Sequence, residues 1–444
     1  MTKHRKREIR SIVCEEVIPI PSLNLPELKE TRCRRNVETQ SLIFNCKPAR
    51  RHMGGCLCCG SINYYVHGHK RNRLVHDVSI GIIHVDLFVD IPRYKCNDCG
   101  GTFMHPLTCI VEGTQFTQRL YKQIEERGLE GSFDALSKEY GTSPTTIAKI
   151  VANYCEQLER ERKLIAPRVL GIDEKHIVHN ARGVFVDVET SRFLELTADN
   201  KAETMWQTIA SMEGYENIQV VTMDMHKPYL SMVQERLPNA KVVIDKYHVF
   251  QNLYTRVHES KKAIAEYLKV QTNNLPEGDE KEQKLEMLAS LGKHKYLFKF
   301  SVKKLHKKPE RVKLMAEACK VFPEFNTLRY LKEGMEYIYS SQTREEAELR
   351  HYEWKKVLPK KDPLFKEIVA FSKTVDRWKT YIFNYFDEGC RYTNAATEGF
   401  NSLIGHINNV GRGYNFKMLR YKVLFSNSTK DSNRNKLTKN DILI

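Results

Sequence analysis

The chain has 444 residues, with 71 Lys and Arg against 55 Asp and Glu, so its formal net charge is +16. Apolar residues make up 41% and charged residues 28%, a mixture typical of globular proteins and not of disordered or collagen-like chains. No stretch approaches the ~18 consecutive apolar residues of a membrane span, and the cationic N-terminus is followed by no apolar segment of a secretory signal. We therefore expect a cytoplasmic protein of roughly two to four domains. The excess of positive charge favours a polyanion, nucleic acid first, as its partner, the alternative being that it serves only solubility.

Residues 1–50 form a basic segment without a recognisable motif. Cysteines gather just behind it, and two Cys-x-x-Cys pairs closed by glycine supply four thiolates at Cys56, Cys59, Cys96 and Cys99. This spacing predicts a structural Zn²⁺ in a zinc ribbon over residues 51–110. Alternating apolar residues from 78 to 91 predict a β-hairpin between the two pairs. Redox-active or incidental cysteine pairs are the alternative, and Cys58 leaves the ligand register of the first pair open.

Residues 111–165 contain the pattern of a helix-turn-helix. A short helix ends at Gly141, which can adopt a left-handed turn, and Ser143 then caps a second helix whose first residue is Pro144. The outward positions of that second helix are Thr145, Thr146 and Lys149, which we expect to contact DNA in a major groove. Residues 116–127 predict a supporting helix. A plain helical hairpin would show the same signals.

The order of elements over residues 166–250 is three strands, a helix, a strand, a helix and a strand. Apolar runs ending in acids mark the strands near 168–173, 218–224 and 240–245. This order predicts a mixed-sheet core of the ribonuclease H-like class, with helices on both faces.

Two carboxylates end neighbouring strands of this predicted sheet, Asp173 on the first and Asp224 after the fourth. Paired carboxylates repel unless a cation lies between them, and hard oxygen ligands suit two Mg²⁺ or Mn²⁺ ions acting on a phosphodiester. A helix is expected to begin near residue 394, and Glu398 lies in its first turn, on the same polar face as Asn401. The alternative is that these acids only cap or begin helices. We assign Glu174, Asp187 and Asp245 to such structural roles, with Asp245 the strongest substitute ligand.

Four motifs follow the cysteines and the helix pair: Gly-Ile-Asp-Glu, Thr-Met-Asp-Met-x-x-x-Tyr, Val-Ile-Asp-Lys-Tyr-His-Val and Thr-Asn-x-x-x-Glu-Gly-Phe-Asn-x-x-Ile. With them the chain resembles the ISL-three family of insertion-sequence transposases from about Cys56 to Tyr421. The resemblance implies a DDE triad of Asp173, Asp224 and Glu398. It also implies Mg²⁺-dependent cleavage at the ends of a mobile element and strand transfer by the freed 3′-hydroxyl. The chain departs from the family where a basic residue often follows the last motif, because Gly405 and His406 stand there.

A helical insertion is expected to interrupt the core over residues 251–390, and the core would resume over 391–425 before a tail at 426–444. Nine Lys and Arg against one acid lie between residues 293 and 313. We expect this stretch to follow DNA phosphates, a solvated helix face being the alternative. The DNA contacts expected here and near the last motif are Lys303, Lys304, Lys307, Lys308, Arg412 and Arg420.

The fold class is thus multidomain α/β. The predicted function is a DNA transposase, associated with the nucleoid when bound, that assembles as a dimer or larger complex on double-stranded element ends and target. A DNA-binding regulator with a non-catalytic rear domain and a nuclease without strand transfer remain alternatives.

Overall fold

The computed structural model describes residues 15–17, 22–36, 41–52, 54–294, 297–299, 305, 307–393 and 395–426. The chain divides into two compact units. The first contains the chain up to Arg162 and again from His406, and the second runs from Lys163 to Gly405. No helix in the described part of the chain is both long and apolar enough to cross a membrane.

The first unit begins with a six-stranded sheet. Its strands lie in the order β1-β2-β3-β5-β4, and β6 pairs with the far part of β5. Their bounds are β1 Glu15–Val17, β2 Leu28–Asn36, β3 Ser41–Pro48, β4 Tyr64–Ile80, β5 Ile83–Cys96 and β6 Thr102–Met104. Residues 28–36 and 41–48, to which the sequence assigned no element, therefore form two strands, and β3 pairs with β5 in parallel.

β5 buries opposite faces along its length. Every second side chain from Val85 to Ile91 is buried in a core shared with β2 and β3. Tyr94 and Cys96, on the opposite face of β5, belong to a second, small core with Cys56 and Phe103. The predicted hairpin is present as β4 and β5, but Ile80 and Ile82 are exposed, because Ile80 ends β4 and Ile82 lies in the turn with Gly81. The apolar alternation near 80 thus marked a turn rather than a core.

Three helices follow the sheet: α1 Gln118–Glu130, α2 Phe133–Tyr140 and α3 Pro144–Glu161. Gly141 ends α2 in the left-handed region, with φ 64°, and the Ser143 hydroxyl caps α3 by accepting the Thr146 N–H. α15, Phe416–Phe425, packs against α1 and α3 although it lies more than 250 residues later in the chain. The helical part of this unit is therefore completed by the C-terminal region.

The second unit is built on a five-stranded mixed sheet in the order β11-β10-β7-β8-β9. β11, β10 and β7 are parallel, and β8 and β9 are antiparallel to their neighbours. The strands are β7 Val169–Ile177, β8 Asn180–Asp187, β9 Arg192–Leu196, β10 Val220–Met223 and β11 Lys241–Ile244. The predicted sequence of three strands, helix, strand, helix and strand is present.

Helices cover both faces of this sheet. α4, Ala202–Ala210, and α5, Lys227–Arg236, share the larger core with one face. On the other face Phe400 of α14, Ala395–Gly411, packs against Phe193 with ring centroids 5.5 Å apart. The middle of β7 thereby lies beside α14, where Asn401 contacts Asp173.

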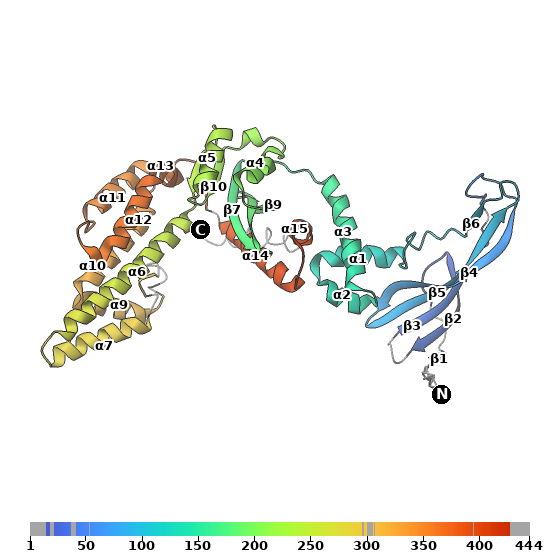
Figure 1. Cartoon of the computed structure of the whole chain (residues 1–444), viewed down its shortest axis with the longest axis horizontal. Coiled ribbons are helices and arrows are strands. Elements are labelled where there is room, and N and C mark those ends of the chain that lie inside the picture. Colours follow the sequence, from blue (N-terminus) through green and yellow to red (C-terminus); the bar gives the residue numbers. More distant parts are fainter. Residues whose placement is uncertain are drawn as a thin grey trace, which may run out of the picture. The chain divides into compact units, whose positions relative to one another are not determined.

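An all-helical insertion separates β11 from α14. Its first helix, α6, leaves the sheet and packs along α10 and α12 (Figure 1). The helices are α6 Lys246–Asn273, α7 Asp279–Lys293, α9 Pro309–Val321, α10 Pro323–Ile338, α11 Arg344–Lys356, α12 Lys366–Arg377 and α13 Lys379–Phe383. Four short 3-10 segments complete the unit: η1 Tyr215–Asn217, η2 Leu297–Lys299, η3 Pro363–Phe365 and η4 Asn384–Phe386. α6 runs unbroken across residues 250 and 251, so the insertion begins directly after β11.

Candidate active site and metal centres

Asp173, in the middle of β7, lies beside Asp224, which directly follows the parallel strand β10. Thr222 of β10 pairs with Gly171 of β7, so continuing the register places Asp224 level with Asp173. Asp173 is 6% exposed. One carboxylate oxygen from each lies within 4.8 Å of the other and of a ring nitrogen of His248. The structure therefore brings together the two acids that the sequence singled out on neighbouring strands.

His248 is the part of this group that the sequence did not assign to the site. It lies in the first turn of α6, whose N-terminal flank is the buried Asp245. Its Nε2 is 2.6 Å from Asp224 Oδ1 and 4.0 Å from Asp245 Oδ2. Burial alone would lower the pKa of His248, but Asp224, Asp173 and Asp245 raise it above the usual value. The available signal was the run Asp245-Lys-Tyr-His248 at the end of a buried strand, from which only the aspartate was weighed.

Asn401 connects α14 to the paired acids. Its Nδ2 donates to Asp173 Oδ2 at 2.7 Å, across 228 positions of sequence. Phe400 and Ile404 of the same helix are buried and hold α14 against the unit. α14 thus turns its polar face toward the carboxylates, as the spacing of these residues predicted.

Glu398 lies one turn before Asn401 but is not within 4.8 Å of all three members of the group. It is close enough for Asp245 and Asp224 to act on it, because burial and these two carboxylates raise the pKa of Glu398. Its buried Oε1 has no hydrogen-bond partner among the described residues. Glu398 therefore lies at the margin of the same site, with an unpartnered carboxylate oxygen.

The electrostatics of the site favour a bound cation. Burial and the neighbouring Asp224 raise the pKa of Asp173 to about 6, against weaker opposing effects of the Glu174 backbone N–H, His248 and Asn401. A buried amide oxygen of Asn401 also lacks a partner in the described part of the chain. Oxygen ligands that repel one another and lack donors fit a hard divalent cation such as Mg²⁺.

A cavity of about 600 Å³ opens at these residues. It continues from Asp173 and Asp224 along the polar side of α6, past Gln251, Asn252 and Thr255. A phosphodiester can therefore reach the carboxylates beside the first helix of the insertion.

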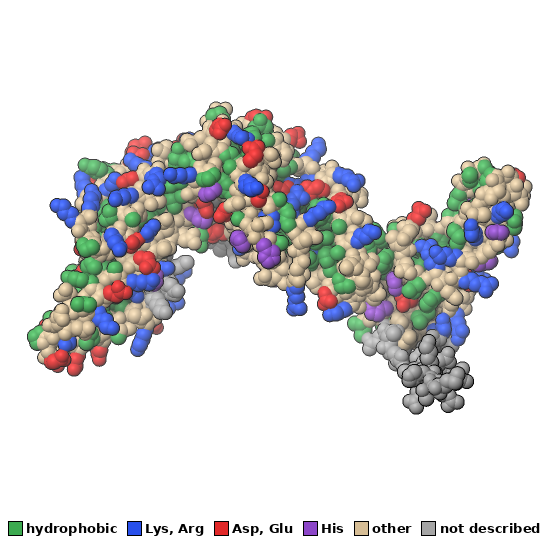
Figure 2. Space-filling model, in the orientation of Figure 1, with side chains coloured by type: hydrophobic (Ala, Val, Ile, Leu, Met, Phe, Trp, Pro, Cys, Tyr) green, Lys and Arg blue, Asp and Glu red, His purple; other side chains and the backbone are tan. Residues whose placement is uncertain are grey.

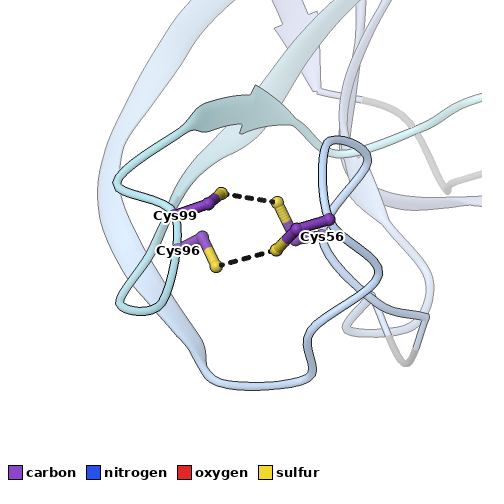
Figure 3. A group of neighbouring side chains, drawn as sticks. Cys56, Cys96 and Cys99 are labelled. Carbon is purple, nitrogen blue, oxygen red and sulfur yellow. Dashed lines mark hydrogen bonds between the residues drawn. The ribbon is translucent and has the colours of Figure 1, made fainter.

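The four predicted zinc ligands also converge (Figure 3). Cys56 Sγ lies 3.7 Å from Cys99 Sγ, and Cys59 Sγ lies 3.7 Å from Cys96 Sγ. Four sulfurs about 2.3 Å from a tetrahedral Zn²⁺ would lie about 3.8 Å apart, so the spacing fits the ion. The Gly101 N–H lowers the pKa of Cys99, but the neighbouring thiols raise it to about 12. A bound cation would remove the repulsion between these sulfurs. The cluster supports a structural Zn²⁺.

Cys58 is exposed and stands outside this cluster. Its backbone N–H donates to Cys56 Sγ at 3.4 Å. The alternative register through Cys58 therefore does not occur in the structure.

The expected DNA contacts on α3 lie at its exposed beginning. Thr145 and Lys149 are exposed, and Thr146 is half-buried. The hydroxyls of Thr145 and Thr146 lie 2.7 and 2.8 Å from the capping Ser143 Oγ. These side chains are accessible to a ligand that approaches the N-terminus of α3.

The remaining expected DNA contacts are dispersed. Lys307 and Lys308 are exposed before α9, whereas Lys303 and Lys304 lie outside the described residues. Arg412 is exposed in a left-handed conformation at φ 47° after α14. Arg420 makes two hydrogen bonds, of 2.9 and 2.8 Å, to Glu159 of α3. This pairing neutralises Arg420 and favours a role in joining α15 to α3.

Two models of known families match this chain. A family model described as a transposase, that of the ISL3 (ISL-three) DDE family, matches residues 170–423. A second model, described as the zinc-finger of transposases IS204, IS1001, IS1096 and IS1165, matches residues 53–99. No curated protein matches the chain.

The first match covers more than half of the chain and the second covers the cysteine cluster. The chain belongs to the ISL3 family of transposases. It is a DNA transposase with an N-terminal zinc ribbon and a mixed α/β transposase domain.

Proposed function

We propose that Asp173, Asp224 and Glu398 are the DDE triad of this transposase and bind two Mg²⁺ or Mn²⁺ ions. The observation that carries the proposal is the convergence of Asp173 and Asp224 on adjacent parallel strands, with the unpartnered Glu398 Oε1 beside them. Ions held there would supply Lewis acidity to the attacking and leaving oxygens of a phosphodiester. The reaction would be cleavage at the ends of the mobile element, followed by attack of the freed 3′-hydroxyl on target DNA.

The topology of the second unit supports a ribonuclease H-like core. Its sheet has three parallel strands and two antiparallel ones in the order β11-β10-β7-β8-β9, with the insertion between β11 and the helix of Glu398. In such a core the last acid comes from a helix that follows the insertion. The position of Glu398 in the first turn of α14 agrees with this assignment.

His248 and Asn401 would position the triad. The imidazole of His248 would keep the carboxylate of Asp224 in place through the 2.6 Å contact. Asn401 Nδ2 would hold Oδ2 of Asp173, while the backbone N–H of Glu174 donates to Oδ1 at 2.8 Å. Partners of metal-binding carboxylates of this kind commonly set ligand orientation and affinity.

For recognition of the element ends we propose a helix-turn-helix formed by α2 and α3, in which Thr145, Thr146 and Lys149 contact base edges or phosphates. The capped, exposed N-terminus of α3 supports this. The lysines before α9 and Arg412 would add phosphate contacts. Because two element ends must be held together, a dimer or larger assembly on DNA is proposed.

The test uses purified full-length protein, Mg²⁺ and DNA that flanks its own gene. Wild-type protein should yield 3′-hydroxyl ends and joined products. Asp224→Asn should abolish both while leaving DNA binding unchanged, and Glu203→Gln, which removes an exposed carboxylate on α4, should act like wild type. Nicks without joining would indicate a nuclease, and binding without chemistry a regulator. Cleavage that survives in both Asp173→Asn and Asp224→Asn would refute the triad.

A further inference from the structure

A second cationic surface lies on the ribbon formed by β4 and β5, away from the helices. Residues 64–73 and 89–96 contain five Lys or Arg and a single acid, Asp90. Figure 2 shows Lys, Arg and His side chains gathered along these two strands. We define the basic ribbon as the exposed or half-exposed residues Tyr65, His67, His69, Lys70, Arg71 and Lys95.

The cations of the basic ribbon are not neutralised. Lys70, Arg71 and Lys95 form no ion pair with any described residue, and Asp90 accepts the backbone N–H of Asn72 at 2.8 Å. Several cations on the helices of the same unit are paired, in Arg119–Asp77, Arg127–Glu139, Lys138–Asp134 and Arg420–Glu159. The three cations of the basic ribbon therefore remain available to an anionic partner.

Protection of a sheet edge accounts for Lys70 and Arg71 but not for Lys95. Lysine and arginine on an edge strand prevent pairing with another chain, and β4 is such an edge. Lys95, however, lies on β5, paired with Tyr65 of β4 on one side and Thr102 of β6 on the other. It has no free edge to protect, yet it is opposite Tyr65 and so shares a face of the ribbon with it.

The shape of the ribbon suits a DNA duplex. Ten residues of strand span about 33 Å, close to the ~34 Å of one turn of B-DNA, and a two-stranded ribbon can enter a major groove. Register shifts between Val66 and Gly68 and between Lys70 and Arg73 interrupt the alternation of side chains, so Lys70 and Arg71 need not point to opposite faces. The zinc cluster holds the end of the ribbon at Cys96, next to Lys95.

We propose that the basic ribbon is a phosphate-binding surface for double-stranded DNA, separate from α3 and without base specificity. The proposal relies on the protein acting on DNA but not on the assignment of the catalytic triad. Its contribution would be to fix the DNA against the first unit, while sequence is read elsewhere. Binding through it should weaken with salt and be equal for unrelated sequences.

The first experiment measures the binding of a duplex of about three turns and arbitrary sequence at several salt concentrations. The triple variant Lys70→Ala, Arg71→Ala, Lys95→Ala should reduce the slope of log affinity against log salt by about 3, since each lost phosphate contact removes about one unit. The matched control Lys360→Ala, Lys361→Ala, Lys366→Ala removes three exposed cations from the insertion and should leave the slope unchanged. An unchanged slope in the ribbon variant, or an equal change in the control, would overturn the proposal.

A second experiment needs no variant and decides the question if the triple variant loses its zinc. Wild-type protein is acetylated at lysine with and without the same duplex, and each site is quantified by mass spectrometry. DNA should protect Lys70 and Lys95 several-fold and leave Lys360 and Lys361 unprotected. Equal acetylation of Lys70 and Lys95 in both samples would contradict the proposal, whether or not the protein cleaves DNA.

Discussion

At the scale of single residues, Asn401 is expected to orient the carboxylate of Asp173 without taking part in the reaction. Its amide nitrogen is 2.7 Å from Asp173 Oδ2. Replacing it with Leu removes the hydrogen bond that orients this carboxylate. We expect Asn401→Leu to raise the Mg²⁺ concentration needed for half-maximal cleavage about 10–100-fold, measured by titrating Mg²⁺ at constant DNA. The exposed neighbour Ser402, changed to Ala, is the control. An unaltered Mg²⁺ titration in Asn401→Leu would exclude the positioning role.

Lys422 is a second residue whose environment determines its chemistry. It is 1% exposed, and its Nζ donates to the carbonyls of Gly128 and Gly131, 2.6 and 2.7 Å away, at the end of α1. The rings of Phe133 and Tyr414 each lie 4.7 Å from it. Burial lowers the pKa of Lys422 to about 8. The lysine thus satisfies two helix-terminal carbonyls at the cost of desolvating its charge.

This pKa predicts how stability changes with pH. Below pH 8 both the folded and the unfolded chain hold the proton. Between about pH 8 and 10 the unfolded chain keeps a proton that the folded chain loses, so the free energy of unfolding rises with pH, by up to about 3 kcal/mol. Denaturant unfolding should show that the free energy of unfolding of the wild type, measured relative to that of Lys422→Met, rises with pH across this range. A constant difference would mean that Lys422 does not titrate in this range.

At the scale of single elements, α15 is held to the first unit mainly by apolar side chains. Leu419 is fully buried, whereas Lys417 is exposed and paired with Glu156. Leu419→Ala should lower the free energy of unfolding of this unit by about 2–5 kcal/mol, because it leaves a cavity. Lys417→Ala should change it by less than about 1 kcal/mol, since exposed ion pairs contribute little. Chemical denaturation distinguishes the two, and equal effects would argue against the packing of α15.

The zinc ribbon makes a similar prediction for the end of β5. Cys96→Ser removes a ligand from the four-sulfur cluster and should abolish stoichiometric zinc, measured by metal analysis of the purified protein. Cys58→Ser changes the exposed cysteine that stands outside the cluster and should keep one zinc per chain. Zinc retained in Cys96→Ser, or lost in Cys58→Ser, would require a different set of ligands.

At the scale of the whole molecule, the four-sulfur cluster and the proposed carboxylate site lie in different units. The sulfur cluster belongs to the first unit and the carboxylates to the second. Omitting Mg²⁺ should therefore abolish cleavage and leave DNA binding intact. Extracting zinc should weaken DNA binding and leave the circular dichroism of the second unit's helices largely unchanged. Binding that requires Mg²⁺ as strictly as cleavage does would contradict this separation.

Local sequence patterns sufficed wherever neighbouring residues determine the structure. Ser143, Pro144 and Gly141 specify where α2 ends and α3 begins, because caps and left-handed turns depend on adjacent side chains. The alternation through Leu87 and Val89 specified the buried face of β5. It did not reveal β2 and β3, where charged residues such as Arg32 and Arg35 weaken the pattern and the partner strand lies some 40 residues away.

The sequence by itself determined the class of this protein: the cysteine spacing, the acids at the ends of apolar strands and the motif order are all local features. The tertiary structure decided which distant groups meet. His248 contacts Asp224, Asn401 donates a hydrogen bond to Asp173, and α15 packs against α1 and α3. The cations of the basic ribbon have no ion pair with any described residue. Such contacts depend on strand register and helix packing across many intervening residues, and no local spacing encodes them.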